Sequence, residues 1–149
     1  MTLEIRAARA GDLDEIARLF DAYRQFYLQP GDPGLARNFV RARFERGEST
    51  VLLAQEDRSI LGFVQLYPTF CSLAAAHVWV VYDLFVDPPA RRRGAGRALL
   101  RAAALHACSD GAARLELATA RDNIAARTLY EAEGWVRDNE FHRYSLALR

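Results

Sequence analysis

The chain has 149 residues, of which 51% are hydrophobic and 26% charged, and its formal net charge is +1. This length suits one globular domain around one core, so we expect residues 1–149 to form a single domain. The near-neutral charge argues against a nucleic-acid partner, which would call for a basic patch and a high pI. A membrane partner is not expected either, because no apolar run approaches the roughly 18 residues of a membrane span.

Cellular location and metal binding follow from small features of the sequence. The N-terminus lacks the apolar core of a secretory signal. Cys71 and Cys108 are too few for a disulfide framework and lack the spacing of metal ligands. We therefore expect a cytoplasmic protein that holds no metal.

The periodicity of apolar residues predicts the elements of the first half of the chain. In order, these are a strand at 3–9, a helix at 12–28, a second helix that ends near 47, a hairpin of strands at 50–55 and 60–67, and a long strand at 77–86. A turn cluster at 29–34, rich in proline and glycine, separates the two helices.

The second half alternates helices and strands. We expect a helix at 98–107, a strand at 114–119, a helix that follows Asn123, and closing strands at 135–137 and 144–148. Asp122 or Asn123 is suited to cap the start of the last helix, and Gly134 to end it in the left-handed conformation. The order predicts an α/β (α+β) fold.

A glycine-rich turn joins the long strand to the helix at 98–107. After Val86, two prolines end the strand, and the pattern Arg91-x-x-Gly94-x-Gly96 leads into the helix. Amides at a helix N-terminus bind phosphate, and the glycines let an anion approach the backbone. The turn is not a P-loop, because the chain has no lysine, and not a dinucleotide-binding fingerprint, because Leu99 stands at the third glycine position. We therefore interpret it as a diphosphate-binding turn.

A second pattern lies about thirty residues downstream. It runs from Asn123 through Ala126, Leu129 and Tyr130 to the pair Gly134-Trp135. Asn123, Ala126 and Tyr130 fall at helical spacing, so they share one face.

Together the two segments resemble those of the GCN5-related N-acetyltransferase (GNAT) superfamily, in particular a bacterial branch similar to yeast histone and polyamine acetyltransferases. The resemblance covers the whole chain. It implies a mixed, mostly antiparallel central sheet with flanking helices, in which the parallel strands at 77–86 and 114–119 splay apart. It also implies direct transfer of an acetyl group from acetyl-CoA to a primary amine in a ternary complex.

The resemblance further implies which residues bind the cofactor. Main-chain groups at the end of the long strand would pair with the pantetheine arm, and the turn would hold the pyrophosphate. The implied acetyl-CoA residues are Leu84, Phe85, Val86, Arg91, Arg92, Arg93, Gly94, Ala95, Gly96, Arg97, Asn123 and Ala126. Tyr130 matches the family's tyrosine near the thioester sulfur, where it could protonate the departing thiolate or hydrogen bond to it.

Some members of the family, the diamine acetyltransferases among them, carry Glu-Asp before an apolar triplet on this strand, and here Tyr82 stands at the glutamate position. The resemblance therefore makes Asp83 our leading candidate for the general base or for the anchor of a substrate ammonium, with Glu116 in reserve. A structural ion pair between Asp83 and an arginine is the alternative.

The resemblance implies an acceptor pocket built from the first helices, and aromatic rings beside one carboxylate suit an alkylammonium, so we expect Tyr23 and Tyr27 to bind the acceptor. The alternative for Tyr23 and Phe26 is that their rings fill the core around the first helix. Further candidates for the acceptor pocket are Phe26, Gln29, Tyr67 and Phe70.

The expected acceptor is a small amine, a polyamine, an amino-acid-like amine or a lysine side chain. Two other functions stay open, a non-catalytic CoA-binding or sensor module and an acyltransferase with a different acyl donor or acceptor. By resemblance we expect a homodimer, with residues 135–148 as its contact.

Overall fold

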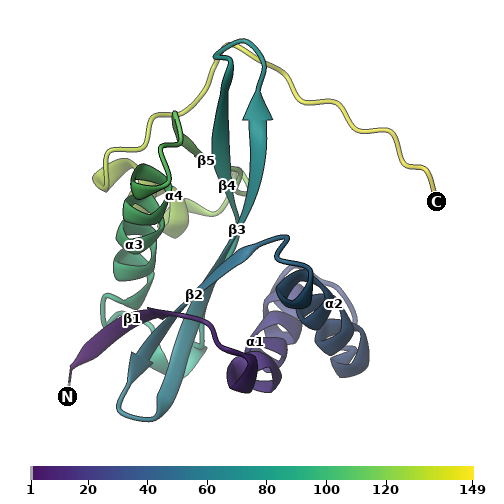
Figure 1. Cartoon of the computed structure of the whole chain (residues 1–149), viewed down its shortest axis with the longest axis vertical. Helices are drawn as coiled ribbons and strands as arrows, with labels where there is room; N and C mark the ends of the chain where they lie inside the picture. The colour runs from purple at the N-terminus through teal and green to yellow at the C-terminus, as the bar shows by residue number, and fades with distance from the viewer. Residues whose placement is uncertain (1) are drawn as a thin grey trace. The chain divides into compact units, whose positions relative to one another are not determined.

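The computed structural model describes residues 2–149. Contacts along the chain divide it into two compact units, Met1–Ala118 and Thr119–Arg149, which we describe separately. The first unit holds a mixed sheet with helices, and the second holds one helix and an extended segment (Figure 1).

The sheet of the first unit has the order β1-β2-β3-β4-β5. The first four strands are antiparallel to their neighbours, and β5 runs parallel to β4, so the mixed α/β fold expected from the sequence is confirmed. The strands are β1 (Leu3–Ala7), β2 (Thr50–Glu56), β3 (Ser59–Cys71), β4 (Ala76–Val86) and β5 (Leu115–Leu117). The hairpin of β3 and β4 is longer than expected, since β3 continues beyond the predicted end at residue 67 to Cys71.

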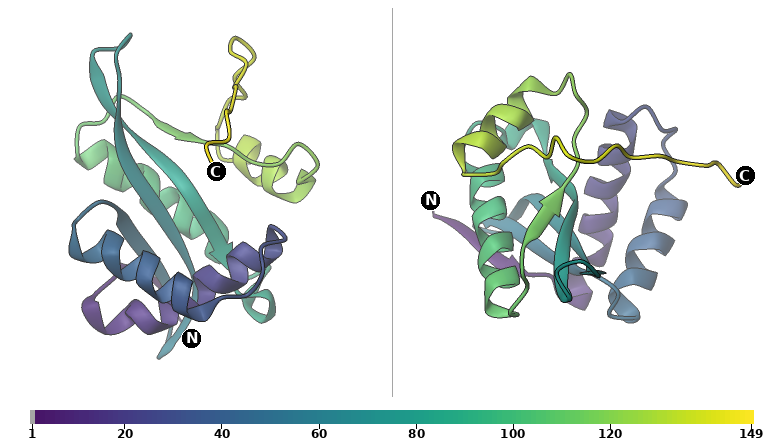
Figure 2. Two further views of the ribbon diagram at one scale, coloured as in Figure 1. Left: turned by 90° about the vertical axis from the view of Figure 1, so that its right-hand side faces the viewer. Right: turned by 90° about the horizontal axis from the view of Figure 1, so that it is seen from above.

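Helices cover both faces of this sheet (Figure 2). α1 (Leu13–Phe26) and α2 (Pro33–Glu45) lie on one face, and α3 (Ala95–Ser109) lies on the other. Short 3₁₀ turns, Ala10–Asp12 and Pro88–Ala90, precede α1 and follow β4. α2 begins where Asp32 accepts a hydrogen bond from the Leu35 amide (3.1 Å) and where Pro33 needs no amide partner. Among the described residues, no helix is long and apolar enough to cross a membrane.

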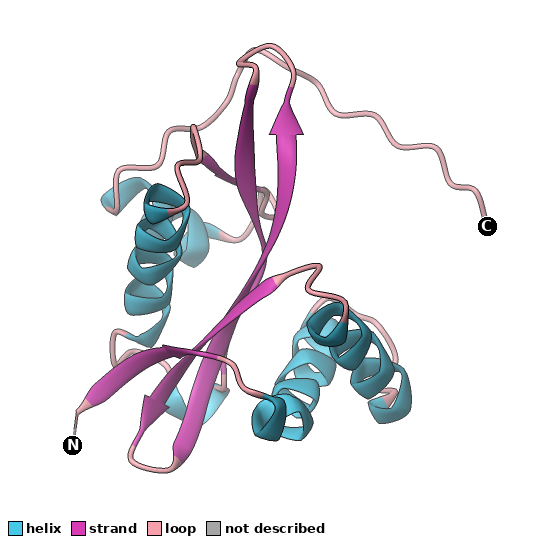
Figure 3. Ribbon diagram, in the orientation of Figure 1, coloured by secondary structure: helices cyan, strands magenta, loops and turns pink. Residues whose placement is uncertain are grey.

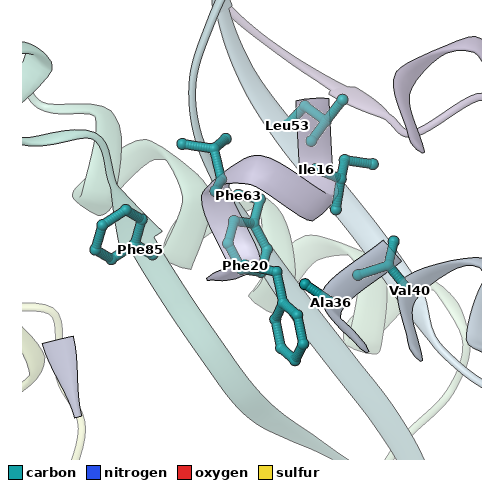
Figure 4. Close-up of a cluster of buried hydrophobic side chains, with 8 residues drawn as sticks. Ile16, Phe20, Ala36, Val40, Leu53, Phe63 and Phe85 are labelled. Carbon is teal, nitrogen blue, oxygen red and sulfur yellow. The ribbon is translucent and has the colours of Figure 1, made fainter. Parts of the chain in front are cut away.

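The core beside α1 and α2 is a cluster of aliphatic and aromatic side chains (Figure 4). Helical spacing brings Ile16, Leu19 and Phe20 to one face of α1, where each is at most 8% exposed. They pack on Phe63 of β3 and Phe85 of β4, which ties α1 to the end of β4. The end of β4 is therefore held firmly on this face.

The second unit contains α4 (Ile124–Ala132). The Asn123 side chain accepts a hydrogen bond from the Ala126 amide (3.3 Å), and Gly134 has a φ of 89°, so both predicted ends of the helix are confirmed. The strands expected at 135–137 and 144–148 are wrong, because the described residues 133–149 form no strand (Figure 3). Alternating apolar residues favour a strand, but a strand forms only where a neighbour accepts its backbone hydrogen bonds.

Candidate active site

A β-bulge interrupts β4 near its end. Gln65 of β3 lies opposite Asp83, whereas Leu66 lies opposite Val81, so Tyr82 has no residue across from it. An inserted residue of this kind bends a strand and increases its twist. The Tyr23 hydroxyl of α1 donates to the Tyr82 carbonyl (3.1 Å), which holds the bulge against the helix.

The bulge opens one edge of β4. β4 pairs with β3 from Ala76 to Val86, but β5 pairs only with residues 79–81 of β4. Beyond Val81, no described residue pairs with the β5 side of β4. The Asp87 amide donates to Leu61 of β3 (2.8 Å), and because backbone groups alternate along a strand, those of Leu84 and Val86 point to the open edge. An extended ligand could add to this edge as a strand does.

Phe85, which we expected among the acetyl-CoA residues, does not face the open edge of β4. By the same alternation its main chain faces β3, and its ring belongs to the core cluster, where it is 6% exposed. A Cβ added to Gly62 would lie 2.6 Å from the Phe85 carbonyl oxygen, so β3 and β4 approach closely here. Phe85 therefore supports the end of β4 from within the core.

Asp83 is buried, with 5% of its surface exposed. Its carboxyl accepts a hydrogen bond from the Gln65 amide (2.7 Å) and contacts the Tyr23 hydroxyl. The alternative of an ion pair with an arginine does not hold, because Asp83 forms no salt bridge with any described residue. A buried carboxyl without a cationic partner has a raised pKa and can accept a proton at a higher pH than an exposed one.

Burial is the main influence on the Asp83 carboxyl, and it raises the pKa. The hydrogen bond from Gln65 and the contact with the Tyr23 hydroxyl act in the opposite direction. Next to it, burial and the nearby negative charge of Asp83 raise the pKa of Tyr67. The Tyr67 hydroxyl is therefore a hydrogen-bond donor at neutral pH.

The glycine-rich turn forms the N-terminus of α3, as predicted. Gly94 is its N-cap with a φ of 85°, and the first bond of the helix runs from the Ala98 amide to the Gly94 carbonyl (3.0 Å). The amides of Ala95 and Gly96 precede this bond and have no acceptor within the helix. A Cβ added to Gly94 would meet nothing within 4 Å. The turn thus presents amides and open space to an anion such as a diphosphate.

The arginines of this turn have different surroundings. Arg91 turns back, where its Nε donates to the Val86 carbonyl (2.9 Å) and its guanidinium lies 5.3 Å from the centre of the Phe85 ring. Arg93 forms a salt bridge with Glu56 of β2 (3.3 Å). Arg92, in the left-handed conformation with a φ of 65°, and Arg97 are both exposed.

Aromatic rings gather at the end of α1. The ring of Tyr23 lies 5.2 Å from that of Tyr27, which in turn lies 5.2 Å from Phe26. Tyr27 and Phe26 are 42% and 54% exposed, whereas Tyr23 also packs on Phe63 of the core. Tyr23 therefore both fills the core and contacts Asp83.

Gln29 and Phe70, two further expected members of the acceptor pocket, are both exposed. Gln29 is exposed beyond the end of α1. Phe70 is 82% exposed near the tip of the β3–β4 hairpin, about 16 Å along the strand from Gln65 at 3.3 Å per residue. The structure therefore does not bring Phe70 to Asp83.

Sequence reasoning missed two residues of this site, Tyr82 and Gln65. Tyr82 is 62% exposed, and its ring lies 5.3 Å from that of Tyr67. Gln65 is 2% exposed. A lone polar residue in the apolar run at 60–67 was the available signal for Gln65, since a buried polar group needs a partner.

Three candidates lie in the second unit, on α4. Asn123, Ala126 and Tyr130 are each half-buried, while Ile124 and Ala125 are exposed, so the predicted shared face is confirmed within α4. The ring centre of Tyr130 lies 6.1 Å from that of Trp135.

The reserve candidate, Glu116, lies on β5. It accepts a hydrogen bond from Arg114 (2.7 Å), which also donates to the Cys71 thiol (3.2 Å). Among the described residues, no group of three metal-ligating side chains gathers anywhere.

A mixed sheet whose parallel pair is opened by a bulge, with a glycine-started helix next to it, defines an acetyltransferase fold. The profile of the acetyltransferase (GNAT) family matches residues 14–135. The chain belongs to this family and is an N-acetyltransferase.

Individual relatives agree with this assignment. The chain is 44% identical to an uncharacterized N-acetyltransferase of Bacillus subtilis, YhfO, over 97% of both chains. A crystal structure of a probable acetyltransferase superposes with a TM-score of 0.91 at 38% identity, over 98% of both chains. An L-ornithine N5-acetyltransferase of Arabidopsis thaliana is 35% identical over 52% of this chain and 34% of its own length.

Proposed function

We propose that the protein transfers an acetyl group from acetyl-CoA directly to a primary amine, in a ternary complex. The observation that carries this proposal is the bulge at Tyr82, which puts an open strand edge beside the buried carboxyl of Asp83. The thioester of acetyl-CoA and the general base, Asp83, would meet at this edge of β4. The rest of this site serves either the cofactor or the acceptor.

Acetyl-CoA would be held by main-chain groups. The edge at Leu84 and Val86 suits the amides of the pantetheine arm, and the amides at the start of α3 suit the pyrophosphate. Arg92 and Arg97 are exposed and would add positive charge near the pyrophosphate. Arg91 would instead keep its hydrogen bond to the Val86 carbonyl. Asn123 and Ala126 are carried over as cofactor residues from the family pattern, and both remain proposals.

Acetyl transfer needs one group that removes a proton from the amine and one that stabilises the departing thiolate. Acetyl-CoA supplies an acyl thioester. An alkylammonium has a pKa of about 10.4, so about one acceptor molecule in a thousand is a free amine at neutral pH. Asp83 would take the ammonium proton, directly or through water. Tyr130 would donate a hydrogen bond or a proton to the departing sulfur. A thiol pKa near 8.5 against about 10 for tyrosine makes full transfer uphill by roughly 2 kcal/mol.

The rings of Tyr23, Phe26 and Tyr27 would bind the alkyl part and the cation of the acceptor. Cation–π attraction contributes about 0.5–1 kcal/mol at exposed sites and more when the cation is desolvated. The partial likeness to an ornithine N5-acetyltransferase supports an amine at the end of a short chain. We therefore favour a small amine, polyamine or amino-acid-like acceptor over a protein lysine.

Thiol release from acetyl-CoA in the presence of polyamines, amino acids, aminoglycosides and a lysine peptide tests this proposal. Tyr130→Phe is expected to lower kcat at least tenfold on the preferred acceptor, in line with about 10²–10⁴ for acid–base groups. Thr128→Val is the matched control, because it also removes a hydroxyl from α4 but at an exposed position. Binding of acetyl-CoA without turnover of any acceptor would favour a non-catalytic CoA-binding module instead.

We propose that the protein is a homodimer joined through residues 135–148. Five apolar side chains of this segment are between 71% and 92% exposed: Val136, Phe141, Tyr144, Leu146 and Leu148. Tyr144, Leu146 and Leu148 alternate as in a strand, and a second copy could supply the missing neighbour. Exposed apolar side chains in such number are unusual on a monomer.

Light scattering after gel filtration tests the homodimer. The wild type is expected to have twice the mass of one chain, and the double variant Leu146→Asp with Leu148→Asp to be a monomer. Leu73→Asp, at a residue that is 91% exposed outside this segment, is expected to leave the mass unchanged. A monomeric wild type would contradict the proposal and favour pairing of the segment within its own chain.

We also propose that both units belong to one catalytic domain, because the family match spans the boundary at residue 118. Cys71 and Cys108 are free thiols, which is the state expected in the reducing cytoplasm, where we place the reaction.

A further inference from the structure

Gln65 is a polar side chain in the apolar centre of β3. It is 2% exposed, and its neighbours Val64 and Leu66 are completely buried. A buried amide without hydrogen-bond partners would destabilise the fold. The role of Gln65 therefore depends on its two hydrogen-bond partners.

These partners fix the orientation of the amide. The Ser49 hydroxyl donates to Gln65 Oε1 (2.9 Å), and Gln65 Nε2 donates to Asp83 Oδ2 (2.7 Å). An ionised carboxylate only accepts hydrogen bonds, so the NH₂ end of Gln65 faces Asp83, and the Ser49 hydroxyl donates to the carbonyl end. A donor at this distance favours a carboxyl that carries negative charge.

We propose that Gln65, oriented by Ser49, is the positioning residue for Asp83. The two hydrogen bonds that link Ser49, Gln65 and Asp83 hold one oxygen of the Asp83 carboxyl against β3. They keep this carboxyl able to accept a proton. This inference rests on the proposed role of Asp83 as the base. It assigns to the buried glutamine a role in the reaction beyond the packing of the sheet.

The surroundings of Asp83 leave this role to Gln65. The Tyr23 hydroxyl of α1 faces Asp83. The ionisable groups next to Asp83 on the sheet are Tyr67 of β3 and the adjacent Tyr82. Arg43 of α2 and Glu48 act on Tyr67 rather than on Asp83. After burial, which raises the pKa of Asp83, the Gln65 hydrogen bond is the largest influence, and it lowers the pKa.

Two variants test the positioning role, each compared with the wild type. Gln65→Met keeps the length of the side chain and removes the donor. Ser49→Ala keeps Gln65 and frees its amide to turn, and because Ser49 is only half-buried, this variant is expected to fold. The measurements are the ¹³C NMR titration of the Asp83 carboxyl, which needs no acceptor, and the pH dependence of kcat/KM.

In Gln65→Met the titration of Asp83 and the acid limb of kcat/KM are expected to move together to higher pH, with a smaller move in Ser49→Ala. Each pH unit of movement lowers kcat/KM on that limb about tenfold. A purely structural role would lower Tm and leave the Asp83 titration in place, and that result in both variants would overturn the inference. A titration that moves while the kcat/KM profile stays would support Gln65 as the residue that positions the carboxyl, and would refute Asp83 as the base.

Discussion

Replacing Asp83 by asparagine is expected to lower kcat/KM about 100-fold or more and, at the same time, to raise Tm. The activity falls because the variant has no group at this position to take the ammonium proton, and such groups contribute about 10²–10⁴ in rate. The stability rises because a buried charge is replaced by a neutral amide that can keep the hydrogen bond from Gln65. Opposite changes in activity and stability mark a residue kept for function.

The pH dependence of both effects follows from the raised pKa of Asp83. Below the unfolded pKa of about 3.9 the carboxyl is protonated in both states, so wild type and variant have similar stability. As the pH rises from there through the folded pKa, the unfolded state loses its proton first, and the wild type is destabilised. The gain in Tm is thus expected at neutral pH and not near pH 4. The loss of kcat/KM is likewise largest where Asp83 is ionised.

Glu116→Gln is the matched control for Asp83→Asn. Glu116 is a half-exposed carboxylate that is paired with Arg114 (2.7 Å), so its change is expected to leave kcat/KM within about threefold of the wild type. A loss of activity in Glu116→Gln, with an active Asp83→Asn, would reassign the base to β5. Thermal unfolding and steady-state kinetics at several pH values separate these outcomes.

Gly94→Ala is expected to weaken acetyl-CoA binding about tenfold, which corresponds to about 1.4 kcal/mol. The φ of 85° is left-handed, where a side chain costs about 1–2 kcal/mol. The added methyl group would also project into the open space in front of the α3 amides, where we place the pyrophosphate. Isothermal titration calorimetry with acetyl-CoA measures this change.

Gly111→Ala is the control for Gly94→Ala. Gly111 follows the other end of α3, has a φ of 76°, and an added Cβ there also meets nothing within 4 Å. The two variants are expected to lose similar stability, because the strain is similar. Only Gly94→Ala is expected to lose affinity for acetyl-CoA. Equal affinities in the two variants would contradict the pyrophosphate position.

The features that depend on short stretches of chain were predictable. The Asn123 side chain bonds to an amide three residues away, and Gly94 and Gly134 adopt the left-handed conformation that glycine permits without strain. Asp83 was predicted from the resemblance to the family, by its place before an apolar triplet on this strand. Arg91 could not be placed in the same way, because its guanidinium has several anionic or aromatic partners within reach and only the folded turn selects the Val86 carbonyl.

By itself, the sequence determined the order of the helices, the strands of the first unit and the glycine-started helix, because periodicity, caps and turns act over a few residues. The family followed from the resemblance of two short motifs. Tertiary structure alone decided the bulge at Tyr82, the open edge of β4 and the bond from Gln65 to Asp83. It also left residues 144–148 without a strand partner. Register and pairing join residues far apart in sequence, 18 positions in the case of Gln65 and Asp83. The free energy of each alternative register depends on the whole set of side chains packed against the sheet.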